Sequence, residues 1–427
     1  MTVALIFIGL VALVLIDVPI AIALGAISVA AVVAASGVST LPNIGLVMFE
    51  GARQFTLIAI PLFILAGAIM NSSGISQRLI ALVSALLGFV RGGLAMVTIG
   101  TSMFFAEMTG SAVADVAALG SILIPAMERK GYSKAFAAAV MSSSSTLAII
   151  IPPSLPMILY AVMSGSSVVE LFVAGIIPGI LGGVLLMVMA YVIAVRQGFP
   201  IEETFEISRV VAALKDALWA LTLPIVILGG IFSGFVTATE GAGLAVVAAL
   251  FVGGVIYREL DLARLRTAMM EAARQTAIVM LLVATSALLG DFLTSQQIPQ
   301  QIAAGIIGLT DSPILILALL NVFLLAIGLF LHSSAAIILV VPIVMPLVRA
   351  VGIDPIHFGL VVTLNLGIGQ QTPPVASVLV TACSIAKADV WAVTRVNMFF
   401  IAVLVLVLLL VTYIPAIPLV LVRLFYD

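Results

Sequence analysis

Two segments share one pattern of prolines and glycines and decide the fold: IPAMERKGYSKAFAAAVMSSSSTLAIIIPPS at 124–154 and MPLVRAVGIDPIHFGLVVTLNLGIGQQTPPVA at 345–376. Four positions match at one and the same offset: Pro125 with Pro346, Gly131 with Gly352, Pro152 with Pro373, and Pro153 with Pro374. Proline makes up only 19 of 427 residues, so three coincident prolines are improbable by chance. The two segments therefore predict an old internal duplication.

The chain around these segments is too apolar for a water-soluble protein. Of its residues, 63% are hydrophobic and 8% charged, whereas soluble domains carry about 25% charged residues. The net charge of -2 excludes a nucleic-acid binder that works through clustered basic residues. One cysteine and two histidines argue against a disulfide framework and a structural zinc site. The composition predicts an all-α integral membrane protein embedded in the lipid bilayer.

Apolar runs of about 20 residues predict the membrane crossings. We expect ten, at approximately 3–36, 55–73, 76–92, 134–162, 168–196, 216–237, 240–258, 276–294, 356–385 and 393–424. The first run has no basic region before it, so we expect a retained span and not a signal peptide. Stretches 94–127 and 313–348 carry small and polar residues at their centres, and each is predicted to be a re-entrant hairpin of two limbs.

The distribution of basic residues favours re-entrant hairpins over crossings. With both hairpins re-entrant, one side receives 14 of the 17 basic residues, and the other keeps only Arg78, Arg349 and Arg423. The positive-inside rule makes the richer side cytoplasmic and places both termini on the opposite side. Between crossings, we expect 197–215 to be a solvated loop and 258–274 to be a separate interfacial amphipathic helix.

Five predicted crossings separate the two hairpins, so the second unit is inverted relative to the first. We expect a first repeat at 1–215, with hairpin 94–127 and a broken helix at 134–162, and a second at 216–427, with hairpin 313–348 and a broken helix at 356–385. Each repeat thus supplies about five transmembrane helices. The breaks are predicted at the Pro-Pro pairs, which remove backbone donors.

Broken backbone at membrane depth survives only where protein or a cavity satisfies it, so the two breaks indicate a binding site. Proline kinks stabilised by neighbouring hydroxyls are the structural alternative. Unwound segments offer oxygen ligands to a hard cation, and helix N-termini attract anions. The segments 94–127, 135–162, 313–348 and 357–385 contain no Lys or Arg. A bound anion would need co-bound cations there, which predicts cation-coupled transport.

Three ionisable residues lie near the predicted hairpin tips. Glu107 and Asp115 flank the first tip and are candidate functional groups or helix caps. His332 lies near the second tip, where it is a candidate solute contact, a titrating group or a partner of a neighbouring hydroxyl.

Seven ordered pieces of the chain resemble the large membrane subunit of the tripartite ATP-independent periplasmic (TRAP) transporters. They are GSAVADVAALGSILIPAM at 110–127, GYSKAFAAAV at 131–140, IPPSLPMILY at 151–160, LFVAGIIPG at 171–179, the segment from Gly229 to Glu240, GIDPIHFG at 352–359 and TPPV at 372–375. The resemblance covers nearly the whole chain.

This resemblance implies an elevator-type transporter of the bacterial inner membrane, so the side on which the charge distribution places both termini is predicted to be periplasmic. It implies Na+ symport with two or more ions, a small four-helix membrane subunit (DctQ-type) and a periplasmic substrate-binding protein (DctP-type). The family's sodium sites map onto Ser111, Ser144, Ser145, Gly328, Gly369 and Thr372. We expect the solute to contact Thr109, Ser111, Ser154, His332, Ser333 and Gln370.

The chain departs from the family pattern at two places. His332 stands where the family commonly has Asp, and Gln370 and Gln371 stand where the motif before Thr-Pro-Pro is usually apolar. Both changes add hydrogen-bonding groups, which predicts a differently shaped or more strongly acidic solute head group.

The sequence therefore predicts the large permease subunit of a Na+-coupled, binding-protein-dependent importer of a small organic anion, a carboxylate or sulfonate. A stand-alone Na+/dicarboxylate symporter of the same superfamily is the alternative, and it would need no small subunit. An intramembrane hydrolase is disfavoured because no histidine lies near Ser111 or the serines at 142–145 in sequence. We expect no enzymatic activity and no nucleic-acid partner, and the sequence leaves the identity of the anion open.

Overall fold

The computed structural model describes residues 6, 8–10, 12, 13, 16, 18–199 and 204–426, apart from the side chains of residues 107–109. Within this part of the chain the regular structure is helical and no strand occurs, so the prediction of an all-α protein is confirmed. Seven of its helices are long and apolar enough to cross a membrane. Further apolar helices of 10–17 residues make up much of the remainder.

The helices follow one another with short connections. In chain order they are α2 (Ile20–Ser36), α3 (Leu41–Ala52), α4 (Ala59–Ser72), α5 (Ile75–Leu87), α6 (Gly93–Thr109), α7 (Ala112–Arg129), α8 (Lys134–Ser145), α9 (Leu155–Ser164), α10 (Val168–Gln197), α11 (Ile207–Phe232), α12 (Ala238–Leu250), α13 (Leu262–Ser295), α14 (Ile298–Ile307), α15 (Pro313–Gly328), α16 (Ser333–Ala350), α17 (Pro355–Gly369), α18 (Ser377–Ala386), α19 (Val390–Tyr413) and α20 (Ala416–Tyr426). Shorter turns are η1 (Val38–Thr40), η2 (Phe55–Ile58), η3 (Thr146–Ile149) and the π-helical η4 (Phe251–Ile256).

Both predicted hairpins are pairs of helices joined by a tight tip, and both predicted broken helices are interrupted at their Pro-Pro pair. α6 and α7 pack together as the first hairpin, and α15 and α16 form the second. The first break comprises residues 142–154, which are the last turn of α8, η3 and the segment before α9, and the second comprises residues 367–376, which are the end of α17 and the segment before α18. Whether the hairpins are re-entrant stays a prediction, since the structure contains no bilayer.

The helix bounds repeat along the chain at the offset that relates the matched prolines. α7 begins at Ala112 and ends at Arg129, and α16 begins at Ser333 and ends at Ala350, so the same offset relates both ends. The starts of α8 and α17 are related in the same way, as are the starts of α3 and α13. The offset that four sequence positions indicated therefore extends to helices throughout the chain. The continuous helix α13 corresponds to α3, η2 and α4 together.

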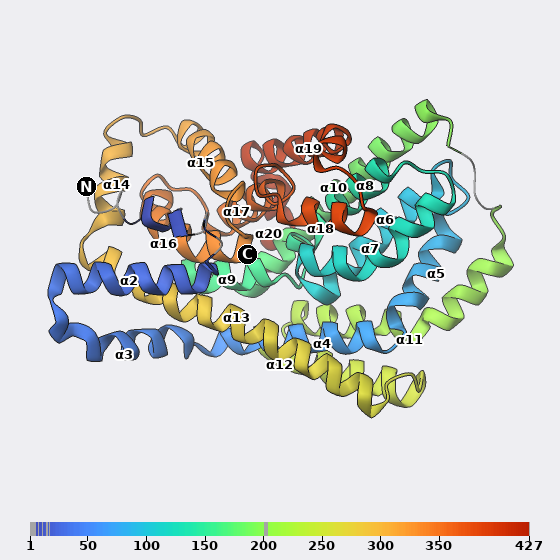
Figure 1. The fold of residues 1–427 in the computed structure, drawn as a ribbon, viewed down its shortest axis with the longest axis horizontal. Helices are drawn as coiled ribbons and strands as arrows, with labels where there is room; N and C mark the ends of the chain where they lie inside the picture. The colour runs from blue at the N-terminus through green and yellow to red at the C-terminus, as the bar shows by residue number, and fades with distance from the viewer. Residues whose placement is uncertain are drawn as a thin grey trace.

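Figure 1 shows two groups of helices, one above the other. The scaffold layer consists of α2, α3, α4, α12 and α13, in which α13 packs on α2, α3 and α4, and α12 packs on α4. The hairpin layer consists of α6–α10 and α15–α19. The two layers touch where α4 meets α6 and where α13 meets α16. This arrangement places the scaffold against the two hairpins.

Three predicted segments differ from the structure. The stretch 258–274 is not a separate interfacial helix, because α13 runs without interruption through 34 residues, or about 51 Å. From Leu262 to Leu289 this helix contains neither Gly nor Pro, so the charged stretch continues directly into the apolar one. The predicted loop 197–215 is helical from Ile207 onward. The predicted crossing 393–424 is divided, because α19 ends at Tyr413, directly before Ile414 and Pro415.

The remaining differences are two helices that were not predicted and one predicted crossing in which the helix begins later than expected. The helices α3 and α14 were not predicted. In the predicted crossing 3–36, α2 begins only after Pro19, and much of the earlier part lies outside the described residues. A proline at this place fixes its own φ and starts a new helix more readily than it continues one.

Arg78 contacts residues that the charge distribution placed on the opposite side of the membrane. Its guanidinium pairs with Glu259 at 2.6 Å and with Asp216 at 3.3 Å, both in or beside segments assigned to the cytoplasm. The predicted crossing 76–92, which separated Arg78 from these segments, is therefore wrong. α5 has only 13 residues, and about 20 Å of helix is too short for a hydrocarbon core of about 30 Å.

Candidate functional site

The first hairpin tip rests on the first break. α6 ends in Gly110, whose positive φ of 56° gives the left-handed turn that joins it to α7. A Cβ added to Gly110 would lie 3.0 Å from the Leu155 backbone nitrogen, so only glycine fits this close approach. Ser111 follows in extended conformation at the N-cap of α7 and is partly buried. The side chains of Glu107 and Thr109 lie outside the described residues, so the predicted solute contact of Thr109 stays a prediction.

The first break presents buried hydroxyl groups. Ser142 and Ser145, on the last turn of α8, are fully buried, and neither hydroxyl oxygen has a hydrogen-bond partner in the structure. Ser144 lies between them in sequence, and its hydroxyl lies 3.0 Å from that of Ser102 on α6. A buried polar atom without a partner is costly unless a ligand satisfies it. These oxygens therefore fit a bound cation.

Ser154 has a local structural role at the end of the same break. Its side chain is fully buried. The hydroxyl donates to the Ile149 carbonyl at 2.6 Å and accepts from the Met157 N–H at 3.4 Å, which caps α9. These bonds account for Ser154 without a solute, although its predicted solute contact stays untested.

The second hairpin and the second break meet through two glycines. Gly328 ends α15 and Gly369 ends α17. A Cβ on Gly369 would overlap the Gly328 backbone, and a Cβ on Gly328 would come within 3.1 Å of the Gly369 Cα. The structure thus brings these two predicted sodium-site residues together. Thr372, the third predicted residue here, donates its hydroxyl to the Ile368 carbonyl at 2.9 Å.

The two tips open onto one cavity of about 790 Å³, which we call the tip cavity. Four helices begin at its wall, and each contributes its first residue to the lining: Ala112 of α7, Leu155 of α9, Ser333 of α16 and Ser377 of α18. The free N–H groups and positive dipole ends of four helices therefore converge on one space. Such an arrangement attracts an anion without any Lys or Arg.

The opposite wall of the tip cavity belongs to the scaffold layer. Asn71 and neighbouring small residues of α4 line it, as do Glu271 and Gln275 of α13. Among the described residues that line it, Glu271 is the only one with a carboxylate, and none is Lys or Arg. His332 completes the polar lining beside Ser333 and Ser334. The space therefore lies between the two layers, and its described lining offers no basic side chain other than that histidine.

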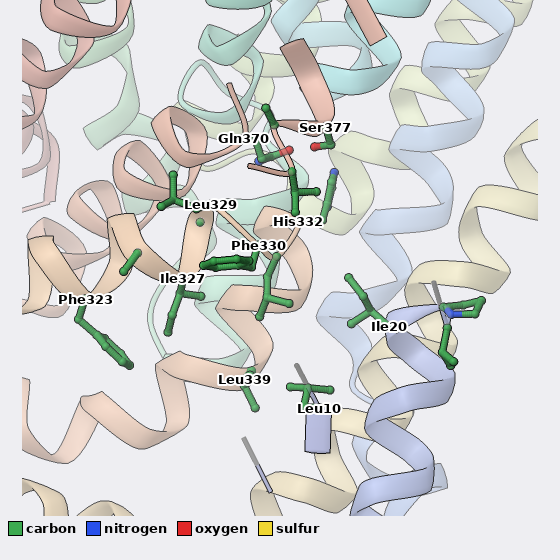
Figure 2. Close-up of a pocket in the computed structure, with 17 residues that line it drawn as sticks. Leu10, Ile20, Phe323, Ile327, Leu329, Phe330, His332, Leu339, Gln370 and Ser377 are labelled. Atoms are coloured by element: carbon green, nitrogen blue, oxygen red, sulfur yellow. The ribbon is translucent and has the colours of Figure 1, made fainter. Parts of the chain in front are cut away.

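A second, mostly apolar cavity of about 970 Å³ lies on the other side of the second tip. Figure 2 shows His332, Gln370 and Ser377 together at one end, with Phe323, Ile327 and Leu339 along its length. Gln370 lines this cavity and is not among the described residues that line the tip cavity. Its side-chain oxygen is buried without a partner, as is the hydroxyl of Ser377. His332 and Ser377 line both spaces, so they stand at the boundary between them.

Several functional candidates were not predicted from the sequence. Ser377, Asn71 and Glu271 line the tip cavity, yet Asn71 and Glu271 come from segments far from the Pro-Pro motifs in sequence. The sequence offers one indication of Ser377, because a helix must begin again after the second Pro-Pro pair and Ser377 is a polar residue at that place. Asp115, predicted as a functional group or a cap, is fully buried in the first turn of α7.

Comparison with known proteins identifies the family. Residues 7–417 match the family described as "Tripartite ATP-independent periplasmic transporter, DctM component". The chain belongs to this family. It is a family of transporter permeases and not of enzymes. The TRAP resemblance predicted from the seven sequence pieces is therefore confirmed.

Named relatives within the family differ in their solutes. The chain is 40% identical over 94% of its length to the isethionate TRAP transporter permease protein DctMQ of Oleidesulfovibrio alaskensis, and it spans 64% of that longer protein. It is 39% identical to the C4-dicarboxylate TRAP transporter large permease protein DctM of Pseudomonas aeruginosa, over 88% of both chains. It is 37% identical to the sialic acid TRAP transporter large permease protein SiaM of Vibrio cholerae, over 88% of both chains.

The fold is also found in a solved structure. The Alcanivorax borkumensis YdaH transporter matches with a TM-score of 0.64 at 16% identity, over 88% of both chains. At this identity the match shows the fold alone. It supports the assignment of the chain to an all-helical transporter architecture.

Proposed function

We propose that this permease imports a small organic anion, a carboxylate or sulfonate, together with Na+. The convergence of four helix N-termini on the tip cavity is the observation that carries the proposal. An anion is attracted there by backbone N–H groups, while the lining contains Glu271 and neither Lys nor Arg. Co-bound Na+ supplies the positive charge that the side chains omit.

The proposed sodium sites lie at the two breaks. The first uses Ser111 of the first tip with Ser144 and Ser145 of α8, and Ser145 has a buried oxygen without a partner. The second uses the backbone around Gly328 and Gly369, which lie in contact, together with Thr372. Hydroxyl and carbonyl oxygens are the ligands that a hard cation prefers. Two or more ions are expected per transport cycle.

The proposed solute site is the tip cavity, with Ser111, His332 and Ser333 as its contacts. We propose that Gln370 approaches the solute only from the second cavity. The hairpin layer carries ions and solute past the scaffold layer in an elevator movement. A small DctQ-type subunit stabilises the scaffold, and a DctP-type binding protein delivers the solute at the periplasmic side.

Transport by the complete complex tests this proposal. The subunit, a small DctQ-type subunit and a DctP-type protein encoded beside it would be assayed in proteoliposomes with radiolabelled isethionate, a C4-dicarboxylate and sialic acid. We expect accumulation of at least one anion under an inward Na+ gradient and only with binding protein present. Equal uptake under a K+ gradient would contradict Na+ coupling, and full uptake without binding protein would contradict the tripartite assembly.

A further inference from the structure

A buried cluster of four polar side chains joins the two breaks directly. The side-chain oxygen of Gln371, in the second break, lies 2.9 Å from the hydroxyl of Ser143 on α8. The Gln371 amide nitrogen donates to the hydroxyl of Thr146 at 2.9 Å, at the start of η3. Asn397 of α19 lies 2.6 Å from Ser143 and donates to Gln371 at 3.2 Å. We call these four residues the break bridge.

The break bridge satisfies its polar atoms internally. Each of its four residues is at most 1% exposed. Gln371 uses both ends of its amide, because its nitrogen donates to Thr146 and its oxygen accepts from Asn397. The Ser143 hydroxyl lies within reach of the side-chain oxygens of Gln371 and Asn397 and donates its one hydrogen to one of them at a time. Hydrogen bonds in a dry interior are strong. Removing one partner leaves the remaining polar groups buried without a hydrogen bond, which costs their full desolvation free energy. The cluster therefore holds the two breaks in one fixed arrangement.

Members of the bridge lie next to the proposed ion ligands in the sequence. In the first break, Ser143 lies between Ser142 and Ser144, and Ser144 and Ser145 are proposed for the first ion. In the second, Gln371 is followed by Thr372, which is proposed for the second ion. A shift of either break that widens its ion site must therefore move a bridge residue. Because each bridge residue is bonded across to the other break, that shift also changes the second site.

We propose that Gln371 is a positioning residue that couples the two sodium sites, so that an ion bound at one break raises the affinity of the other. The inference rests on the proposed function, since it assumes one Na+ at each break. An ion that orders α8 fixes Ser143 and Thr146, which in turn hold Gln371 and the second break. Coupling of this kind changes affinity by about 5- to 150-fold in typical cases. It also makes the loading of the carrier steep with respect to Na+ concentration.

Equilibrium titrations of the complete complex with radioactive Na+ test the coupling, because independent sites bind without cooperativity, whereas uptake that needs two ions is sigmoidal in either case. The wild type should give a sigmoidal curve with a Hill coefficient clearly above 1. Gln371→Met keeps the length and volume of the side chain but removes the bridge, so it should lower the Hill coefficient toward 1 and raise the half-saturating Na+ concentration by about 5-fold or more. Ser143→Ala leaves Gln371 bonded to Asn397 and Thr146, so it should shift both quantities less, in the same direction.

A matched control separates coupling from a general loss of stability. Tyr160 on α9 donates a hydrogen bond of 2.6 Å to the Pro355 carbonyl at the start of α17, so it too connects the two halves, but away from both breaks. Tyr160→Phe should leave the Hill coefficient unchanged. If Gln371→Met cannot be purified as a folded complex, Ser143→Ala serves alone against the same control.

The outcomes distinguish this inference from the function on which it rests. A Gln371→Met complex that binds Na+ with the Hill coefficient of the wild type would overturn the coupling role. A wild type whose uptake needs Na+ but whose equilibrium Na+ binding is hyperbolic would also overturn it, while the proposed Na+ coupling would stand. A wild type whose uptake is independent of Na+ would overturn both.

Discussion

The first and second breaks occupy corresponding places in the two halves of the chain, yet they present oxygens in different ways. The first break is rich in hydroxyl side chains, of which Ser142 and Ser145 are buried without partners. The second brings backbone together, because Gly328 and Gly369 touch without any side chain between them. Two regions at corresponding places can thus offer oxygens from side chains in one case and from the backbone in the other.

The difference predicts that the two breaks tolerate opposite kinds of substitution. Removal of a hydroxyl should harm the first break, whereas addition of a methyl group should harm the second. The ion pair between Arg78 and Glu259 lies outside both breaks, so its loss should leave the Na+ dependence of transport unchanged.

Gly369→Ala should have the largest effect, because its Cβ would overlap the Gly328 backbone. Overpacking of this kind costs about 1–3 kcal/mol, and here it would also separate the second tip from α17. We expect transport to be lost and the thermal unfolding temperature of the purified complex to fall. Gly290→Ala in α13 is the matched control, since no atom lies within 4 Å of its added Cβ. Transport by Gly369→Ala at the wild-type rate would refute the close-contact role of this glycine.

Ser145→Ala should weaken Na+ binding without lowering the stability of the fold. The hydroxyl is buried and has no protein partner, so its removal costs no internal hydrogen bond. Loss of one ligand to a charged group costs about 1.5–3 kcal/mol, or about 10-fold or more in affinity. We expect the half-saturating Na+ concentration of uptake to rise by that factor, with the unfolding temperature unchanged or higher. Ser28→Ala, which removes a buried hydroxyl bonded to Leu24 within α2, is the control and should leave Na+ dependence unaffected.

Glu259→Gln should have the smallest effect. It replaces the carboxylate that pairs with Arg78, in a pair whose side chains are 19% and 37% exposed. Partly exposed pairs contribute about 1 kcal/mol or less, and Arg78 keeps Asp216 at 3.3 Å and the ring of Tyr257 at 3.8 Å. Thermal unfolding should show a small loss of stability, while the half-saturating Na+ concentration should not change. A large change in the half-saturating Na+ concentration would show that this ion pair affects the conformation of the breaks.

The sequence predicted the parts of the fold that proline and glycine fix locally. Pro-Pro pairs remove backbone donors wherever they occur, so both breaks could be placed from the sequence. Gly110 could be placed at a tip for a similar reason, because its turn needs a positive φ. Among the residues predicted to contact ions or solute, Ser111, His332 and Ser333 line the tip cavity.

The parts that sequence reasoning missed depend on contacts between distant segments. Arg78 was assigned to a side from the hydropathy of its own segment, whereas its partner Glu259 lies 181 residues away. Gln371 was interpreted as a hydrogen-bonding group near the solute site because it stands where the family motif is usually apolar. In the structure it faces the other way and bonds to Ser143, 228 residues earlier. No local pattern distinguishes these directions, because adjacent residues at a broken helix end point to different neighbours.

Equilibrium binding of radioactive Na+ to the purified complex tests the central claim most directly, because it needs no knowledge of the transported anion. The measurement would count the ions bound per chain, with an excess of K+ present, for the wild type and for Ser145→Ala. Saturable binding of two or more Na+ per chain, weakened in Ser145→Ala, is the result predicted by two sodium sites at the two breaks. Absence of saturable binding in the wild type, or its complete displacement by K+, would contradict the claim that Na+ supplies the charge missing from the tip cavity.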